Sequence, residues 1–563
     1  MQPLRALLPL AMLSLSAAPT NAQTPKLALG ADPAAACASI AAHSIPVTSI
    51  GIPSGPGTID SATLMPATPM AVAEKGPTPA ARIAPATPSY CKVLGRIAPI
   101  DPTAPPIRFQ INLPLEWNGR SVQYGGGGFN GTVITGLGLP PGHPFDRPSP
   151  LAQGYVTYGT DSGHETKQGE PPAAFALNEE AFVNFAHASY KKVRDAAVST
   201  MRQAYNQQPV KLYFMGSSEG GREGLTMAQR YPADFDGVFA RVPVINWTAL
   251  NHASAQSGIV TMGEGWLSPA HVKLVHDAAL TSCDADDGVA DKLIANPDSC
   301  LAKADLSNLV CKTGQAPATC LNEKQIAAVK WLRSPTKWSF ALANGITEYP
   351  GWGISGEATP AFGPTGGWMA WWTGNAAPEQ PPKAGNAIQW IYGSAGIRYV
   401  FARDPNLDVT TYRPEDHKAR VLEVSALMDS TNPDLSAFQT RGGKLIILEY
   451  MADYAQSPYA GIRYFESVQK KMGPVTSSFA RLYAAPGVDH VGSGAPANVD
   501  MLAVLAEWVE NSKTPDPLVV IEQTVEAEPK TVRALPLCRW PMWPKYTTGD
   551  PTQADSFQCV TNP

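Results

Sequence analysis

The sequence predicts an α/β protein, in which a mostly parallel sheet flanked by helices is interrupted by a large inserted domain. The first observation is that apolar, strand-like runs alternate with helical segments between residues 107 and 245, an order that favours parallel pairing. The second is a tight Gly-Ser turn that joins a strand to a helix within residues 211–230. The third is a break in the pattern near residue 246, after which a buried strand resumes at residues 442–450.

The composition narrows the class of protein. Of the 563 residues, 44% are hydrophobic and 16% are charged, with 54 prolines and 48 glycines, which is typical of a globular, loop-rich chain. The net charge of -5 provides no basic field, so we expect no nucleic-acid partner. Met1–Ala22 predicts a signal peptide, because Arg5 precedes an apolar core and a small-residue cleavage zone. No later stretch has the ~18 apolar residues of a membrane helix, so we expect a secreted or periplasmic protein without a membrane span.

The eight cysteines fit an exported protein. Their number allows about a hundred connectivities, and the sequence alone does not choose among them. None has CxxC spacing, so we expect neither a redox motif nor a structural zinc site. Local spacing suggests the pairs Cys283–Cys300, Cys311–Cys320 and Cys538–Cys559, which leaves Cys37 with Cys91.

The segments before the Gly-Ser turn differ in composition and in the periodicity of their apolar residues. Residues 23–88 are rich in Ala, Pro, Thr and Ser and predict a loosely structured entry with a short β-like patch at Val47–Ile50. The periodicity that follows predicts, in order, strands at Ile107–Leu113, Ser121–Tyr124 and Tyr155–Asp161, a helix at Glu180–Tyr205 and a strand at Lys211–Met215.

The turn itself has the Gly-x-Ser-x-Gly pattern of a nucleophile elbow. Glycines at positions 216 and 220 let the backbone turn sharply and leave the Ser218 hydroxyl clear of the sheet. The helix that begins after Ser218 offers free N–H groups to a developing negative charge. A plain link between strand and helix is the alternative, but the strand before and the helix after favour a nucleophilic Ser218.

A second glycine-rich segment, Gly125–Gly131, follows the strand at Ser121–Tyr124. Consecutive glycines bring backbone N–H groups close to a bound group without interference from side chains. If the elbow is real, this loop supplies an N–H of the oxyanion hole. A flexible surface loop or a phosphate cradle is the alternative, although the Lys-Ser/Thr ending of a phosphate loop is absent.

Two further polar side chains lie just beyond predicted strands. Asp453 follows the strand at residues 442–450, and His490 follows another at residues 479–485. The chain order Ser, Asp, His is that of the α/β-hydrolase fold. Asp489 is the competing carboxylate, but we expect its side chain to point away because it is adjacent to His490.

Residues 246–439 form the predicted insertion, a lid between a first part of the fold at residues 23–245 and a second part at residues 440–563. The insertion contains nine of the thirteen tryptophans, most of which we expect in its own core. In a hydrolase, such an insertion covers the site and forms the substrate pocket. We select Trp371 as a pocket residue.

An acidic turn lies within the insertion, directly after Cys283. Dense oxygen ligands suit calcium, with carboxylates from Asp284, Asp287 and Asp291 and backbone carbonyls from Val289 and Leu293. The spacing is not that of an EF-hand. An exposed acidic turn without metal is the alternative.

Together these motifs resemble the tannase and feruloyl esterase family of secreted α/β-hydrolases, and the most specific part is the elbow with its Glu-Gly-Gly-Arg-Glu-Gly extension. The resemblance implies a catalytic triad of Ser218, Asp453 and His490, oxyanion N–H groups from Gly128 and Glu219, and a structural calcium ion at the acidic turn.

Two features of the chain differ from the family pattern. Ser217 and Val491 stand where that pattern has a disulfide-linked cysteine pair beside the nucleophile and the histidine. Residues 373–397 also lack the arginine with which the terephthalate-ester enzymes of the family hold a carboxylate, and Arg398 and Arg403 are the candidates to replace it.

We therefore expect a secreted serine carboxylic-ester hydrolase that acts on small esters of aromatic acids, as feruloyl esterases and tannases do. Hydrolysis of mono(2-hydroxyethyl) terephthalate is the alternative within the same class. A non-catalytic, calcium-dependent protein that binds aryl ligands is the alternative from another class.

Overall fold

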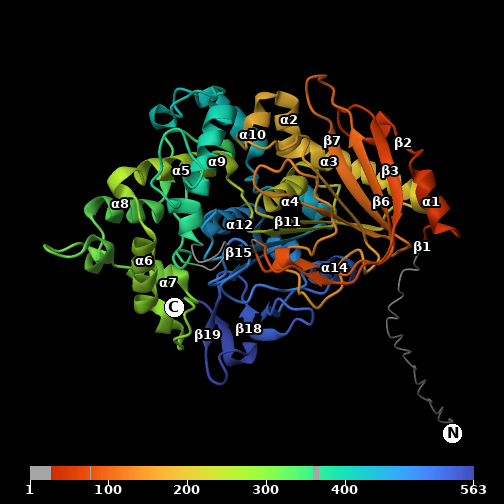
Figure 1. The fold of residues 1–563 in the computed structure, drawn as a ribbon. Coiled ribbons are helices and arrows are strands. Elements are labelled where there is room, and N and C mark those ends of the chain that lie inside the picture. The colour runs from red at the N-terminus through yellow and green to blue at the C-terminus, as the bar shows by residue number, and fades with distance from the viewer. Residues whose placement is uncertain (1–26, 77, 359–366, 563) are drawn as a thin grey trace, which may run out of the picture.

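The computed structural model describes residues 27–76, 78–358 and 367–562. The predicted signal peptide, Met1–Ala22, lies outside these ranges. The centre of the fold is a 10-stranded sheet (Figure 1). Its strands are, in spatial order, β16 (Ala480–Ala485), β15 (Lys444–Tyr450), β12 (Gly237–Arg241), β11 (Lys211–Ser217), β9 (Arg120–Tyr124), β10 (Val156–Thr160), β7 (Ile107–Pro114), β6 (Tyr90–Ile97), β3 (Gly57–Met65) and β2 (Ser44–Ile45).

The sheet has a parallel half and an antiparallel half. Every neighbouring pair from β16 to β10 is parallel, whereas the pairs from β10 to β2 are antiparallel. The predicted α/β-hydrolase fold is confirmed. The parallel pairing lies between β16 and β10, and the remaining strands of the sheet are antiparallel. Because parallel strands end at one common edge, β11, β15 and β16 deliver the residues that follow them to the same side of the sheet.

Helices cover both faces of the parallel half. Phe214 of β11 packs with α4 (Glu219–Arg230) and α12 (Pro458–Met472), whereas Tyr213 and Met215 pack on the opposite face with α14 (Met501–Asn511). Burial on both faces explains why these strands are continuously apolar. The predicted helix at residues 180–205 is α2 (Glu179–Val183), a π-helical turn and α3 (Ser189–Tyr205).

The N-terminal part of the chain is more ordered than its composition predicts. The expectation of a loose entry is wrong over the described residues, because α1 (Pro33–Ile40) packs on β3 and β3 pairs along its length with β6. Val47–Ser49 forms a 3-10 turn instead of a strand. Thr58, Asp60 and Thr63 of β3 are exposed, so this strand lacks the apolar signal of the central ones.

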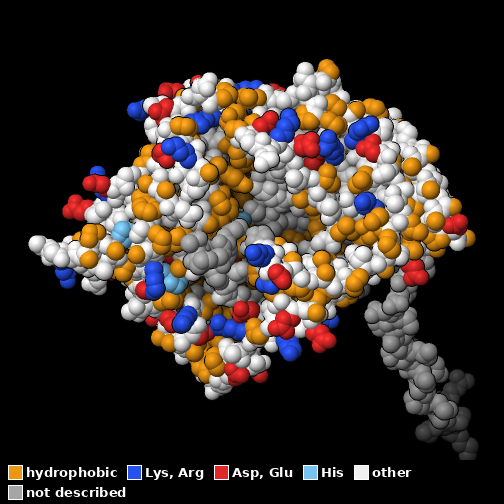
Figure 2. Space-filling model, viewed as in Figure 1, with side chains coloured by type: hydrophobic (Ala, Val, Ile, Leu, Met, Phe, Trp, Pro, Cys, Tyr) orange, Lys and Arg blue, Asp and Glu red, His pale blue; other side chains and the backbone are white. Residues whose placement is uncertain are grey.

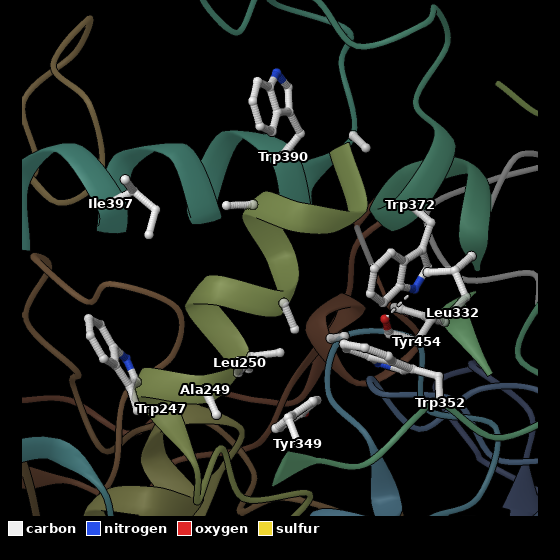
Figure 3. Packing of buried hydrophobic residues seen from close by; sticks show 14 of the residues in the cluster. Trp247, Ala249, Leu250, Leu332, Tyr349, Trp352, Trp372, Trp390, Ile397 and Tyr454 are labelled. Atoms are coloured by element: carbon white, nitrogen blue, oxygen red, sulfur yellow. Dashed lines mark hydrogen bonds between the residues drawn. The ribbon is translucent and has the colours of Figure 1, made fainter. Parts of the chain in front are cut away.

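The insertion lies between β12 and β15 and is mostly helical, at the left of Figure 1. Figure 3 shows its core, in which Trp352 and Trp372 are in edge contact, with ring centroids 4.2 Å apart. Trp372 Nε1 donates to the carbonyl oxygen of Tyr454 at 2.7 Å, so this core is tied to the segment after β15. Its elements are α5 (Trp247–Val260), α6 (Pro269–Cys283), α7 (Pro297–Lys303), α8 (Glu323–Leu332), β13 (Thr336–Lys337), β14 (Glu348–Tyr349), α9 (Ile388–Ala395), α10 (Lys418–Met428) and α11 (Ser436–Thr440).

Short peripheral elements complete the fold. They are the hairpin β17 (Leu518–Gln523)–β18 (Thr531–Leu537), the hairpin β19 (Trp543–Tyr546)–β20 (Phe557–Val560), the pairs β1 (Leu27–Ala28)–β8 (Glu116–Trp117) and β4 (Ala71–Val72)–β5 (Ile83–Ala84), and helix α13 (Thr476–Phe479).

All four predicted disulfides are confirmed, namely Cys37–Cys91, Cys283–Cys300, Cys311–Cys320 and Cys538–Cys559. Four disulfides are typical of a protein that folds in an oxidising compartment outside the cytoplasm. Within the described ranges, every helix is too short or too polar to cross a membrane. Figure 2 shows charged side chains of both signs dispersed over one face, without a large patch of either sign.

Candidate active site

The turn between β11 and α4 has the geometry of a nucleophile elbow. Ser218 has φ 61° and ψ -123°, a conformation that a non-glycine residue rarely adopts. A side chain at Gly216 would place its Cβ 2.0 Å from the carbonyl oxygen of Gly220, and one at Gly220 would place it 2.7 Å from that of Gly126. Only glycine fits at both positions, which explains the Gly-x-Ser-x-Gly pattern.

Ser218, His490 and Asp453 form one hydrogen-bonded chain. His490 Nε2 lies 2.9 Å from Ser218 Oγ, and His490 Nδ1 lies 2.7 Å from Asp453 Oδ2. The other oxygen of Asp453 accepts from the backbone N–H groups of Ala455, at 2.7 Å, and Gln456, at 3.0 Å. With Nδ1–H donating to the carboxylate, Nε2 is left with the lone pair that can take the serine proton.

The competing carboxylate, Asp489, has a different role. Its Oδ1 accepts from the backbone N–H groups of Val491, at 3.1 Å, and Ser493, at 2.9 Å. Asp489 therefore shapes the loop that carries His490, and the carboxylate bound to the imidazole is that of Asp453.

The glycine-rich loop lies directly against the elbow. Gly220 N donates to the carbonyl oxygen of Gly126 at 3.2 Å, and a Cβ on Gly125 would lie 2.6 Å from the Cα of Gly220. Gly128 has φ 58°, and its N–H, like that of Glu219, donates to no acceptor in the described part of the chain. Both residues line the same cavity as Ser218, and two free N–H groups on one cavity with the nucleophile are what an oxyanion hole requires.

A buried carboxylate that the sequence analysis did not select holds this loop. Glu223 of α4 accepts from Gly126 N at 3.0 Å and from Asn130 Nδ2 at 2.8 Å. Asn130 Oδ1 in turn accepts from Gly127 N at 2.6 Å. The only sequence signal was the position of Glu223 in the Glu-Gly-Gly-Arg-Glu-Gly extension. That motif does not indicate that Glu223 binds the loop of Gly126 and Asn130.

A cavity adjoins the Ser218 hydroxyl and is closed by the insertion. Trp371, the predicted pocket residue, lines it, and its ring centroid lies 5.8 Å from that of His490. Tyr392, which no sequence signal identified, makes an edge contact with Trp371 at 6.3 Å. The lining is Gly128, Phe129, Ser218, Glu219, Val244, Trp247, Leu250, Asn251, Ser254, Trp371, Gln389, Tyr392 and Ala455.

The polar end of this cavity is uncharged. Asn251 and Ser254 come from α5, and Gln389 from α9. Ser254 Oγ donates to Gln389 Oε1, and Gln389 Nε2 donates to the carbonyl oxygen of Ala455 at 2.5 Å. No lysine or arginine is among the described lining residues.

The two candidate arginines bind elsewhere. Arg398 Nε donates to the carbonyl oxygen of Leu407 at 2.9 Å, and Arg403 forms an ion pair with Glu179 at 2.5 Å. Neither lines the cavity beside Ser218.

The acidic turn after α6 brings together some of the predicted calcium ligands. Asp284 Oδ1 accepts from Asp291 N at 3.2 Å, Asp287 Oδ1 accepts from Val289 N at 3.0 Å, and the buried Asp287 Oδ2 has no partner in the described ranges. Burial, with the neighbouring carboxylates, raises the pKa of Asp287 to about 6. Asp291 pairs with Arg533.

Among the residues that the structure describes, no three His, Cys, Asp or Glu side chains are grouped to hold a metal ion. The orphaned oxygen of Asp287 fits a cation ligand, whereas Arg533 already neutralises Asp291.

The fold and this site define a carboxylic ester hydrolase of the α/β-hydrolase type. The family model for tannase and feruloyl esterase matches residues 91–560, and the chain belongs to that family.

Similar proteins agree with this assignment. An uncharacterised esterase of Agrobacterium fabrum is 36% identical over 93% of both chains. The mono(2-hydroxyethyl) terephthalate hydrolase of Piscinibacter sakaiensis is 30% identical over 86% of this chain and 87% of its own. The structure of feruloyl esterase B from Aspergillus oryzae aligns with a TM-score of 0.75 over 94% of this chain and all (100%) of its own, at 23% identity, and supports the fold.

Proposed function

We propose that this protein is a serine esterase that hydrolyses small esters of aromatic acids, of the feruloyl or galloyl kind, through an acyl-enzyme on Ser218. The acyl groups we expect carry no charged group besides the carboxyl that forms the ester. The observation that carries the proposal is the hydrogen-bonded chain from Ser218 through His490 to Asp453. It lies at the carboxyl edge of the parallel strands, beside a cavity walled by aromatic rings.

The geometry supports a two-step reaction. His490 Nε2 takes the proton as Ser218 Oγ forms a bond to the ester carbonyl carbon, and the N–H groups of Gly128 and Glu219 stabilise the oxyanion. The bond to the alcohol then breaks, and His490 returns the proton to the leaving alcohol. Water attacks the acyl-enzyme with His490 as the base, and the aromatic acid leaves while Ser218 regains its proton. Asp453 holds the imidazole in the required tautomer throughout.

The cavity favours an aromatic acid without a second charge. Its aromatic wall includes Trp371 and Tyr392, and its polar side chains beyond Ser218 and Glu219 are those of Asn251, Ser254 and Gln389. Amide and hydroxyl groups can bind a phenol, but a free carboxylate buried there lacks a cationic partner, which is costly. We therefore place feruloyl and galloyl esters ahead of mono(2-hydroxyethyl) terephthalate, the substrate named for a relative that is 30% identical.

Steady-state hydrolysis of ethyl ferulate, methyl gallate and mono(2-hydroxyethyl) terephthalate tests the substrate class. We expect kcat/KM to be at least ten times higher for an uncharged acyl group, and a preference for the terephthalate monoester would overturn this ranking. Ser218→Ala tests the nucleophile, because it should lower kcat on the order of 10⁶-fold in a protein that still folds.

A fluorophosphonate probe separates the esterase from a non-catalytic binder. Labelling of Ser218 in the wild-type chain, lost in Ser218→Ala, supports the esterase. An unlabelled but folded protein that binds ethyl ferulate without turnover supports the binder.

We also propose a structural calcium ion at the acidic turn. Asp284 and Asp287 carboxylates, with the carbonyl oxygens of Val289 and Leu293, would hold it, and Asp291 would join after releasing its arginine partner. Support comes from the buried, unpartnered Asp287 Oδ2. Calcium added to protein treated with a chelator should raise the melting temperature, and Asp287→Asn should abolish that rise. Equal melting temperatures with and without calcium would reject the site.

Export to the periplasm or the medium is the third part of the proposal, supported by the four disulfides and the signal-like Met1–Ala22. N-terminal sequencing of the protein recovered outside the cytoplasm should begin at Gln23. An intact Met1 on cytoplasmic protein would contradict it.

A further inference from the structure

A second cavity, of about 320 Å³, lies on the other side of α5 from the catalytic cavity. We call it the outer pocket and define it by His252, Ile259, Trp331, Trp338, Ile397 and Tyr412. Leu250, Asn251 and Ser254 of the same helix line the catalytic cavity, and the two linings share no residue. The outer pocket therefore takes no part in the reaction proposed above.

Aromatic rings build one wall of the outer pocket. The ring centroid of His252 lies 4.7 Å from that of Trp338 and 5.6 Å from that of Tyr412. Trp331 and Trp338 both remain partly exposed. Aromatic surface that is left open within a concave pocket suits a flat, apolar ligand.

The indole N–H of Trp338 is the polar group that this wall leaves unused. Trp338 Nε1 is buried and has no hydrogen-bond partner in the described part of the chain. A buried donor without an acceptor is costly, so buried indole N–H groups usually find a partner. A ligand that displaces the groups covering this N–H and carries an acceptor next to its ring would provide one.

The interior of the pocket carries no formal charge. His252 Nδ1 lies 2.8 Å from the carbonyl oxygen of Thr248, and its Nε2 lies 3.0 Å from the hydroxyl of Tyr412. Burial lowers the pKa of His252 to about 4, so the ring is neutral at neutral pH. The charged lining residues, Lys337 and Glu415, are both exposed to solvent, and Glu415 accepts from the hydroxyl of Ser339.

We propose that the outer pocket binds an uncharged small aromatic molecule, whose ring packs on Trp338 and Trp331 and whose acceptor receives the Trp338 N–H. The volume is at the lower end of the roughly 300–1,000 Å³ of small-molecule sites, which suits a ligand with a single ring.

Titration calorimetry of the full mature chain with phenol tests this proposal. We expect saturable binding with a Kd on the order of 1 mM, as for a small ligand with few heavy atoms. Toluene, which has the ring but no acceptor, and benzoate, which carries a charge, should both bind more weakly than phenol. Equal affinity for all three would contradict the chemistry proposed for the pocket.

Matched variants locate the binding. Gln256→Trp fills the outer pocket from an exposed position of α5 and should weaken phenol binding at least 10-fold. Val244→Phe fills the catalytic cavity instead and should leave phenol binding unchanged. Trp338→Phe keeps a ring but removes the N–H and should weaken binding roughly 3- to 10-fold. Trp543→Phe, remote on β19, is its control.

The opposite pattern would overturn the proposal. Phenol binding that Val244→Phe abolishes and Gln256→Trp leaves unchanged would place the ligand in the catalytic cavity. Absence of saturable binding to a wild-type protein that hydrolyses esters would reject the outer pocket without affecting the proposed esterase.

Discussion

Glu223 should control catalysis through the oxyanion loop, although it touches neither nucleophile nor substrate cavity. Its two carboxylate oxygens accept from Gly126 N at 3.0 Å and Asn130 Nδ2 at 2.8 Å. Glu223→Gln preserves the volume but leaves only one accepting oxygen, so one buried donor then faces an N–H group. Such an unsatisfied donor costs roughly 1–3 kcal/mol, which the loop can relieve by moving.

Movement of the loop displaces the N–H of Gly128 from the developing oxyanion. Because loss of one oxyanion donor costs roughly 3 kcal/mol, we expect a partial displacement in Glu223→Gln to lower kcat about 10- to 100-fold. KM should stay within about threefold, since Glu223 does not line the acyl cavity. The assay is steady-state hydrolysis of ethyl ferulate with thermal unfolding in parallel.

Two companion variants give this test its control. Glu507→Gln makes the same chemical change at an exposed position of α14, where the carboxylate contacts only Asn511 among the described residues, and should leave kcat unchanged. Asn130→Ala removes the other half of the clamp and should act in the same direction as Glu223→Gln. A folded Glu223→Gln protein with kcat within twofold of wild type would refute the reasoning.

Three further predictions concern other parts of the molecule. Burial raises the pKa of Asp161 to about 7, so this group stabilises the fold fully below about pH 4 and loses that contribution as pH rises to about 7. Between pH 4.5 and 7.5 the free energy of unfolding, measured with urea, should therefore fall less in Asp161→Asn than in the wild type. An identical pH dependence in the two proteins would contradict this. Replacing Cys37 and Cys91, which are 54 residues apart, by alanine should lower the free energy of unfolding by about 4 kcal/mol, and unchanged stability would argue against the entropic account. Trp371→Ala should raise KM for ethyl ferulate about 10-fold through lost apolar contact, with a smaller change in kcat; an unaltered KM would exclude the ring from the acyl site.

The sequence predicts those parts of the fold in which the position of a residue in the folded protein restricts the residue type. Strands buried on both faces carry an uninterrupted apolar run, such as residues 445–448 of β15, and the elbow requires glycine at fixed positions around Ser218. Strand β3 has no such signal because half of it is solvated, and the prediction of a loose N-terminal segment failed for that reason. The calcium ligands stay a prediction.

Residues that act through long-range contacts were beyond the reach of sequence patterns. Glu223 meets Asn130 across 93 positions of the chain, and Tyr392 reaches the catalytic cavity from the insertion. Neither Glu223 nor Tyr392 has a local requirement, such as a positive φ or a strand end, that a single sequence can reveal. Ser254 and Gln389 likewise become neighbours only where α5 and α9 pack together.

The two positions where the chain differs from the family's cysteine pair show how the site is held without a covalent link. Ser217 Oγ accepts from Arg241 Nε at 2.9 Å, which fixes the end of β11 to β12. On the other side, Asp489 holds the backbone N–H of Val491 at 3.1 Å. Each segment is thus fixed by its own neighbours, and the distance between nucleophile and imidazole follows from the register of the parallel strands. Since none of the four disulfides includes a residue of these segments, mild reduction should affect activity only through the stability of the fold.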